Sequence, residues 1–238
     1  MSKITITLDE TKNRKDYYEC AEVLLEENGV KQKRVVEISS LLEAFTKSSV
    51  EKPRSIRLGR LPMGFYDGTI CEEHGLLHAE VLIILSKSRQ MMQYETTRYD
   101  VYIPSLVFYF SVSDSRLCGT RVFALKDEWP NEQSSLYVYP FGNVNTYSGS
   151  VCWGANRLQD INRLKDLEAV VALFLQSGCN EDHYKAGVSC ELKEMPLRGL
   201  FEELKKKDSF PEEWLVRRVN SYDCRTIEDL VKQFKMKK

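Results

Sequence analysis

The feature that most constrains the fold is a series of short apolar segments between residues 56 and 125. Each segment is rich in Val, Ile, Leu, Tyr and Phe, and Gly, Pro, Asp and Ser punctuate the series. Segments of this length and content predict β-strands, and their close succession predicts an antiparallel meander. The predicted strands are 57–65, 78–85, 98–103, 106–112 and 121–125. Pro104 separates two of them and cannot donate to a sheet ladder, so we expect it at an edge or a crossover.

The pattern becomes helical in the last third of the chain. Residues 160–176 carry apolar side chains close to a 3.6-residue period, which predicts an amphipathic helix that Asn156 or Asp160 could cap. Two further helices are predicted at 196–207 and 226–234. The second opens with Thr-Ile-Glu-Asp, a sequence typical of a capping box.

The N-terminal part mixes both patterns. Residues 4–8 alternate and are β-branched, and 35–38 are similar, so both predict strands. Residues 16–27 are richer in helix formers, which favours a helix there. Ser39 and Ser40 are predicted to cap a short helix, and the polar stretch 47–53 is predicted to be a linker.

These patterns predict an α+β chain in three parts. We expect an N-terminal β/α extension at 1–55, a core of antiparallel sheet packed by helices at 56–178, and a C-terminal helical extension at 179–238.

Composition narrows the class of protein. The chain has 238 residues, 42% of them apolar, and a formal net charge of −1. A balanced charge argues against a surface devoted to nucleic acid. The longest apolar runs are too short to span a bilayer, and no signal peptide is visible. We therefore expect a soluble, cytoplasmic protein that binds neither nucleic acid nor membrane.

Seven cysteines are scattered along the chain, and none forms a Cys-x-x-Cys pair. An odd, unpaired set predicts reduced thiols rather than a disulfide framework. Cys71, His74 and His78 have a spacing that could suit zinc, but a fourth ligand is missing and the surroundings resemble a strand. Phosphate-binding glycine motifs are also missing. We predict no metal site and no cofactor.

Cys152 differs from the other cysteines by its context. It ends a loop rich in Gly, Asn and Ser, and loops lie near the surface, so its thiol should be reachable. The thiolate is the nucleophilic form of cysteine. The alternative is a small buried hydrophobic residue, which describes most free cysteines. A Cys152–His183 pair for proton transfer is a further hypothesis.

The sequence around Cys152 resembles the signature of ubiquitin-conjugating enzymes, which is His-Pro-Asn, a short loop, then Gly-x-Ile/Val-Cys. The block 149–152, Gly-Ser-Val-Cys, matches the end of that signature, and the resemblance covers about residues 56–182. Tyr139-Pro140 occupies the His-Pro place and Asn143 the Asn place. Two residues separate Pro140 from Asn143 here, where the eukaryotic enzymes have none.

A bacterial branch is more similar: prokaryotic conjugating-enzyme family D and the system protein B of PRTRC cassettes. The similarity extends over most of the chain. The stretches that resemble this branch are 103–108, 122–125, 136–144, 151–154, 197–201 and 210–211. The resemblance implies a ubiquitin-conjugating-enzyme-like antiparallel meander sheet packed by helices.

The same resemblance implies transthiolation. Cys152 would accept a ubiquitin-like protein from an adenylating activating enzyme as a thioester and pass it to an acceptor. Asn143 would stabilise the oxyanion, or else only stabilise its loop. Glu181, Asp182 and His183 follow the helix after Cys152. The resemblance implies that a carboxylate here would help an acceptor amine to lose its proton, and the alternative is a solvated loop. Asp182 and His183 are our catalytic candidates in this segment.

The implied partners also include a JAB-type metalloprotease from the same operon, in a plasmid-linked or antiphage setting. Two other functions stay open from the sequence. One is a binding adaptor of the same fold without catalysis, and the other is an unrelated cysteine hydrolase.

Overall fold

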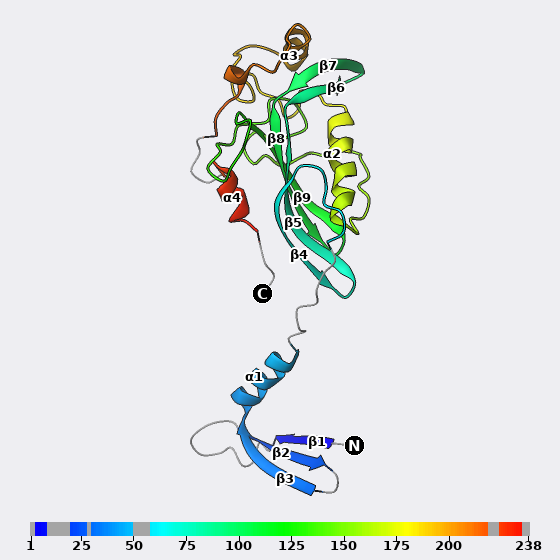
Figure 1. Ribbon diagram of the computed structural model, residues 1–238, viewed down its shortest axis with the longest axis vertical. Helices are drawn as coiled ribbons and strands as arrows, with labels where there is room; N and C mark the ends of the chain where they lie inside the picture. Colours follow the sequence, from blue (N-terminus) through cyan, green and yellow to red (C-terminus); the bar gives the residue numbers. More distant parts are fainter. Residues whose placement is uncertain (1–2, 9–19, 28–29, 50–57, 219–223, 235–238) are drawn as a thin grey trace. The chain divides into compact units, whose positions relative to one another are not determined.

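The computed structural model describes residues 3–8, 20–27, 30–49, 58–218 and 224–234 (Figure 1). Packing divides the chain into two compact units, Met1–Ser55 and Ile56–Lys238. The first unit contains an antiparallel sheet and a helix. The second contains antiparallel sheets and the remaining helices, which is the α+β class that the sequence predicts. A separate C-terminal part beginning at residue 179 stays a prediction.

The N-terminal unit is a three-stranded sheet of order β1-β2-β3, followed by one helix. The elements are β1 (Lys3–Leu8), β2 (Cys20–Glu27), β3 (Val30–Glu37) and α1 (Ile38–Ser49). The helix favoured at 16–27 is wrong for its described part, which is the central strand β2. Pairing with strands on both sides outweighs the helix propensity of Glu, Leu and Ala, because propensity is small beside tertiary contacts. Ser39 and Ser40 lie inside the first turn of α1, so they do not precede it as caps.

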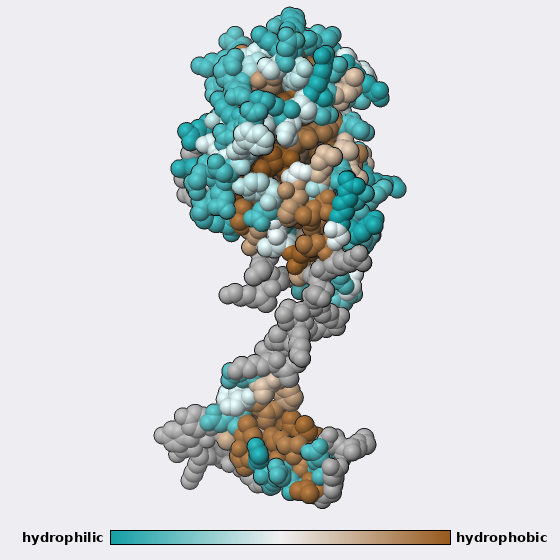
Figure 2. All heavy atoms as spheres, in the orientation of Figure 1, coloured by the Kyte–Doolittle hydropathy of each residue, from teal (hydrophilic) through white to brown (hydrophobic). Residues whose placement is uncertain are grey.

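This unit leaves much of its apolar content at the surface (Figure 2). Among its described side chains only Ala21 is a fully buried hydrophobic residue, whereas Ile4 and Val35 are 62% and 66% exposed. The large buried core of the protein therefore lies in the second unit.

The second unit is built on a four-stranded antiparallel sheet of order β4-β5-β8-β9 and a two-stranded ribbon, β6-β7. The strands are β4 (Phe65–Glu73), β5 (Leu76–Leu85), β6 (Ser88–Tyr94), β7 (Thr97–Ile103), β8 (Ser105–Ser113) and β9 (Arg116–Leu125). Four of the five predicted segments lie on strands. The fifth, 57–65, is wrong because its described part reaches a strand only at Phe65. β6 was not predicted, since its sequence Ser-Arg-Gln-Met-Met-Gln-Tyr has no run of β-branched residues.

The ribbon and the sheet form one long hairpin that is interrupted at Pro104. Leu85 pairs with Leu106 and Ser88 with Ile103, so the register is the same on both sides of the interruption. Proline has no N–H for the ladder, and here Lys87 N donates instead to Ser105 Oγ at 3.0 Å. Pro104 thus lies where the chain passes between the two sheets, as the sequence predicts.

Alternate residues of the sheet enter two different hydrophobic clusters. Val81, Phe108 and Val122 belong to the larger cluster, together with side chains from α2 and α3. Their neighbours Leu82, Val107 and Phe123 belong to the smaller cluster, together with side chains from α4. Because successive strand side chains point to opposite faces, one sheet is covered on both sides (Figure 1).

The helices of this unit are shorter than the sequence predicts. They are α2 (Leu167–Gln176), α3 (Leu197–Leu204) and α4 (Ile227–Val231), with 3-10 turns η1 (Leu164–Asp166) and η2 (Glu212–Trp214). The Thr226–Asp229 capping box is confirmed. No helix in the described ranges is long and apolar enough to cross a membrane.

The helix predicted from residue 160 begins seven residues later because other contacts hold the chain before it in a non-helical path. Ile161 is buried, and its N–H donates to Ser115 O at 2.7 Å. Asp166 Oδ2 then accepts from the N–H groups of Asn162 and Arg163. Asn156 and Asp160 therefore do not cap α2.

Helix α3 closes the end of the core at the β6-β7 ribbon. Phe201 is fully buried, and its ring stacks on those of Tyr99 and Phe141 with centroids 5.0 and 5.2 Å apart. Residues far apart in the sequence thus share one aromatic cluster, so α3 is an integral part of the second unit.

We predict that Phe201→Ala lowers the free energy of unfolding of the full chain by about 3–5 kcal/mol, because it leaves a cavity in this cluster. Met63→Ala is the control, since Met63 is 78% exposed, and it should change stability by less than about 0.5 kcal/mol. Urea denaturation followed by tryptophan fluorescence measures both. Equal losses for the two variants would contradict the role of α3 in the core.

Candidate functional site

A hairpin-like loop on the edge of the sheet carries Cys152. Val144 and Val151 pair across the loop, and Ser150 pairs with Arg121 of β9. Val122 N donates to Gly149 O and Val151 N donates to Thr120 O, both at 2.9 Å. Since β9 is the last strand of its sheet, the loop satisfies backbone groups on an edge that would otherwise lack a strand neighbour.

The tip of the loop is folded around Asn145. Its side-chain oxygen accepts from Tyr147 N and Ser148 N at 3.0 and 2.9 Å, and its backbone oxygen accepts from Gly149 N at 2.8 Å. Asn favours turns of this kind because its side chain can bind backbone groups two and three residues ahead.

Gly149 is required by both conformation and space. Its φ is +74°, a region that residues with a Cβ seldom adopt. A Cβ at this position would also lie 2.3 Å from the ring of Phe123, which is a buried β9 residue. The glycine three residues before the thiol therefore lets the loop lie directly on the sheet.

Arg218 ties the loop to the C-terminal segment. It is buried, with 7% exposed, and its guanidinium donates to Thr146 O at 3.2 Å and to Tyr147 O. It also donates to Cys224 O at 3.2 Å and lies 4.8 Å from the centroid of the Phe123 ring. Sequence reasoning missed Arg218, since one arginine in Val-Arg-Arg-Val gives no sign that it is buried.

Cys152 directly follows residues 149–151, which are bonded to β9, and is itself exposed. Its N–H donates to Asn143 O at 2.8 Å. On either side Val151 and Trp153 are partly buried against the core, and the Trp153 ring meets that of Phe174 edge-on at 6.2 Å. The backbone around the thiol is fixed while the sulfur faces outward.

Asn143 links the Cys152 segment to the chain that follows α2. Its backbone oxygen accepts from Cys152 N, and its Nδ2 donates to Gly178 O at 2.9 Å. Its φ is +66°, which Asn tolerates better than most residues. An amide nitrogen has two hydrogens, so the bond to Gly178 leaves one N–H for another acceptor.

The four residues predicted as catalytic line one pocket of about 430 Å³. Cys152 and Asn143 form one part, and Asp182 and His183 come from the segment after α2. Asp182 is exposed and is held by Asn180, whose Nδ2 donates to Asp182 Oδ2 at 2.8 Å. Glu181 does not line this pocket, and its carboxylate accepts a hydrogen bond from Leu197 N at the start of α3.

The model of one protein family, prokaryotic E2 family D, matches residues 77–218 of the chain. The chain belongs to prokaryotic E2 family D. The match includes the pocket, its loop and Arg218. No curated protein and no solved structure matches the chain.

Tyr139, which we matched to the histidine of the E2 signature, is a core residue in this member of family D. Tyr139 is 3% exposed, and its ring packs against Phe141 and Phe174 with centroids 5.4 Å away in both cases. Burial raises the pKa of its phenol well above the usual value. Tyr139 therefore packs in the hydrophobic core and does not line the pocket.

The cysteines of this E2 family member differ in how far they are buried. Cys179, Cys190 and Cys224 are buried, and burial raises the pKa of each thiol, to about 11 for Cys179. A raised pKa reduces the thiolate fraction at neutral pH. Cys118 is exposed like Cys152 but does not line this pocket.

Cys71, His74 and His78, whose spacing could suit zinc, do not form a metal-binding group in the fold. Cys71 and His78 are paired across β4 and β5, and His74 lies in the turn between these strands. His78 Nε2 lies 3.5 Å from Asp114 Oδ1. Within the described ranges, no group of three or more His, Cys, Asp or Glu side chains could hold a metal ion.

We predict that Gly149→Ala destabilises the protein by at least about 2 kcal/mol, because backbone strain and the collision with Phe123 add together. Gly154→Ala is the matched control. Gly154 also has a positive φ, of +54°, but a Cβ there meets nothing within 4 Å. Denaturant unfolding of both variants separates the two effects. If Gly154→Ala is as destabilising as Gly149→Ala, close packing on Phe123 does not fix the loop.

Proposed function

We propose that this chain is a ubiquitin-conjugating-like enzyme that carries a ubiquitin-like protein as a thioester on Cys152. The observation that carries the proposal is the exposed Cys152 thiol on one pocket with Asn143, Asp182 and His183, in a chain of prokaryotic E2 family D. Family membership supports a conjugating-enzyme-like role in general. The thioester and its transfer are our proposal.

In the first step, the Cys152 thiolate attacks the carbonyl carbon of the thioester between the ubiquitin-like protein and its activating enzyme. A new carbon–sulfur bond forms, the old one breaks, and the thiol of the activating enzyme leaves and takes up a proton. Cysteine suits this exchange because it is intrinsically nucleophilic and partly ionised near neutral pH. The exposure of Cys152 supports access by so large a substrate.

Negative charge builds up on the carbonyl oxygen during the attack, and Asn143 is our candidate to stabilise it. Its backbone is bonded to Cys152 and its side chain to Gly178, and both residues line one pocket, which supports a preorganised amide. Preorganised donors are effective because they need not reorient in the transition state.

In the second step, an acceptor amine attacks the Cys152 thioester and must lose a proton. Asp182 is exposed on the pocket and held by Asn180, and His183 lines the same pocket. We propose that one of these two side chains takes the proton.

The partners that we propose follow from the family. They are a ubiquitin-like protein and an activating enzyme. A JAB-type metalloprotease and a PRTRC or antiphage setting are finer predictions.

We predict that incubation with the activating enzyme, the ubiquitin-like protein and ATP gives an adduct on a non-reducing gel. The adduct should disappear with thiol reductant and in Cys152→Ala, whereas Cys118→Ala, which removes the other exposed cysteine, should retain it. An activating enzyme that charges itself but yields no adduct would favour a non-catalytic adaptor of the same fold.

We predict that Asn143→Ala slows thioester transfer by about 10²–10³ in single-turnover rate, the typical effect of losing one oxyanion donor. Asn143→Gly is the control for the backbone, because glycine removes the amide but adopts the φ of +66° without strain. Both variants should be equally slow. A normal rate in Asn143→Gly would remove the amide from the oxyanion role.

A further inference from the structure

Residues 180–183 form a turn that carries two of the predicted catalytic side chains on the candidate pocket. The turn starts after the buried Cys179, whose N–H donates to Gln93 O and whose carbonyl oxygen accepts from Glu95 N, both at 2.8 Å. These two partners belong to the β6-β7 ribbon and the turn between its strands. The start of the pocket turn is therefore fixed on that ribbon.

The other end of the turn is fixed near α3. Tyr184 N donates to Glu181 O at 3.0 Å, and Tyr184 Oη donates to Met195 O at 2.8 Å. Glu181 Oε1 accepts from the N–H of Leu197, the first residue of α3, at 3.0 Å. Since both ends are held, the turn keeps its place on the pocket without the help of a substrate.

Asn180 closes the turn from within through two different hydrogen bonds. Its Oδ1 accepts from Asp182 N at 3.1 Å, an Asx turn that shapes the backbone. Its Nδ2 donates to Asp182 Oδ2 at 2.8 Å, a bond that the backbone turn does not require. A donor on one carboxylate oxygen limits the rotation of the carboxylate, and charge-assisted bonds of this kind are the stronger ones. No hydrogen bond to the other oxygen, Oδ1, is found among the described residues, so that oxygen stays available as an acceptor.

The Asn180 backbone lies directly on the segment that leads to Asn143. A Cβ on Gly142 would lie 2.3 Å from Asn180 O, so this close approach requires glycine. The backbone from which the Asn180 side chain extends is thus fixed by packing as well as by hydrogen bonds.

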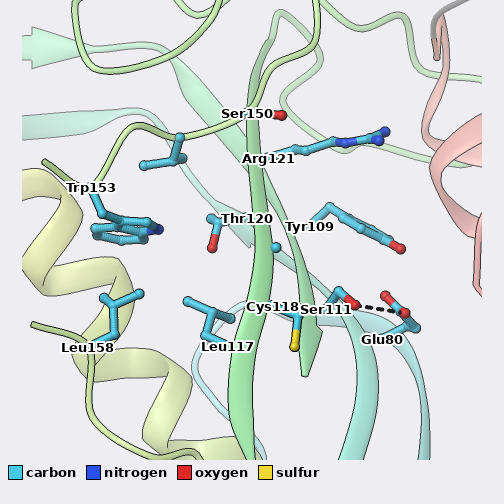
Figure 3. A pocket seen from close by; sticks show the side chains of 12 residues that line it. Glu80, Tyr109, Ser111, Leu117, Cys118, Thr120, Arg121, Ser150, Trp153 and Leu158 are labelled. Atoms are coloured by element: carbon cyan, nitrogen blue, oxygen red, sulfur yellow. Dashed lines mark hydrogen bonds between the residues drawn. The ribbon is translucent and has the colours of Figure 1, made fainter. Parts of the chain in front are cut away.

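The part of the pocket that carries the nucleophile is fixed by other contacts. Trp153, the residue after Cys152, lies with Leu117 and Leu158 on one side of β9 (Figure 3). The Asn180 side chain takes no part in these contacts, so a change in it leaves them in place.

We infer that Asn180 is a positioning residue for the transfer step, in which it aims the Asp182 carboxylate at the acceptor amine. Asp182 rather than His183 then takes the proton, because the Asp182 side chain is exposed and held, whereas His183 is partly buried. The inference rests on the proposed function.

During the transfer, the amine nitrogen bonds to the carbonyl carbon of the Cys152 thioester, and the carbon–sulfur bond breaks. Cys152 leaves as a thiolate, and one proton of the amine passes to the Asp182 carboxylate. A group that accepts a proton must lie within hydrogen-bond reach of it. Holding the carboxylate in place before the acceptor arrives lowers the entropic cost of that arrangement.

The test follows discharge of the isolated Cys152 thioester of the full chain to free lysine in single-turnover reactions. We expect Asp182→Asn to slow discharge by about 10²-fold, the smaller of the effects usual for a group that moves a proton. Asn180→Ala should slow it by about five- to tenfold, because the carboxylate remains but is no longer held in place. In the Asp182→Asn chain, Asn180→Ala should cause no further loss, since its effect passes through that carboxylate.

Asn131→Ala is the matched control. Asn131 Oδ1 accepts from Gln133 N at 2.9 Å, in the same kind of Asx turn, but Asn131 does not line the pocket. Discharge of this variant should proceed at the rate of the unchanged chain. Asn131 and Asn180 are both exposed, so we expect both variants to fold.

Three results would overturn this inference and leave the proposed thioester intact. If Asn180→Ala discharges at the normal rate, or slows discharge equally with and without the Asp182 carboxylate, Asn180 does not act through Asp182. Normal discharge in Asp182→Asn would show that Asp182 does not take the proton. If the unchanged chain forms no thioester at all, the proposed function fails together with this inference, so the two failures are distinguishable.

Discussion

The site depends on the backbone hydrogen bonds between the Cys152 loop and the edge of β9. Val122 N to Gly149 O and Val151 N to Thr120 O, with the isolated β-bridge between Ser150 and Arg121, fix an otherwise irregular loop on the edge of the sheet. A loop of Gly, Asn and Ser has high conformational entropy, so it needs such fixed contacts to hold one sulfur in one place. This attachment fixes the backbone that leads to Cys152, and Asn143 is bonded in turn to Cys152 N and to Gly178 O.

Phe123 joins the loop to the second hydrophobic cluster. Gly149 lies against its ring, and the guanidinium of Arg218 lies 4.8 Å from the ring centroid. Arg218 also donates to the loop carbonyls and to Cys224 O, so the C-terminal segment helps to hold the loop. A buried guanidinium is stable only when its N–H groups have acceptors, which makes this contact specific. Packing on the far side of the sheet is thus connected to the position of Cys152.

Sequence patterns located the strands that are buried on both faces, because β5, β8 and the end of β9 are nearly continuous apolar runs. They missed β6, whose polar sequence is strand only through its pairing with β7, and they favoured helix for the region of β2. The start of α2 was placed too early, since hydrophobic period does not report that Ile161 is held by Ser115. In each case hydrogen bonding to another segment outweighed the local preference of the residues.

The sequence by itself determined the α+β class and membership of prokaryotic E2 family D, and it singled out Cys152 among seven cysteines as the proposed nucleophile. These rest on local composition and on the spacing of Gly149 and Cys152, which a chain carries whether folded or not. Only the tertiary structure decided that Asn143, Asp182 and His183 share a pocket with Cys152, that Arg218 holds the Cys152 loop, and that Tyr139 lies in the core. The reason is physical: proximity and burial arise when distant segments pack, and spacing along the chain does not encode them.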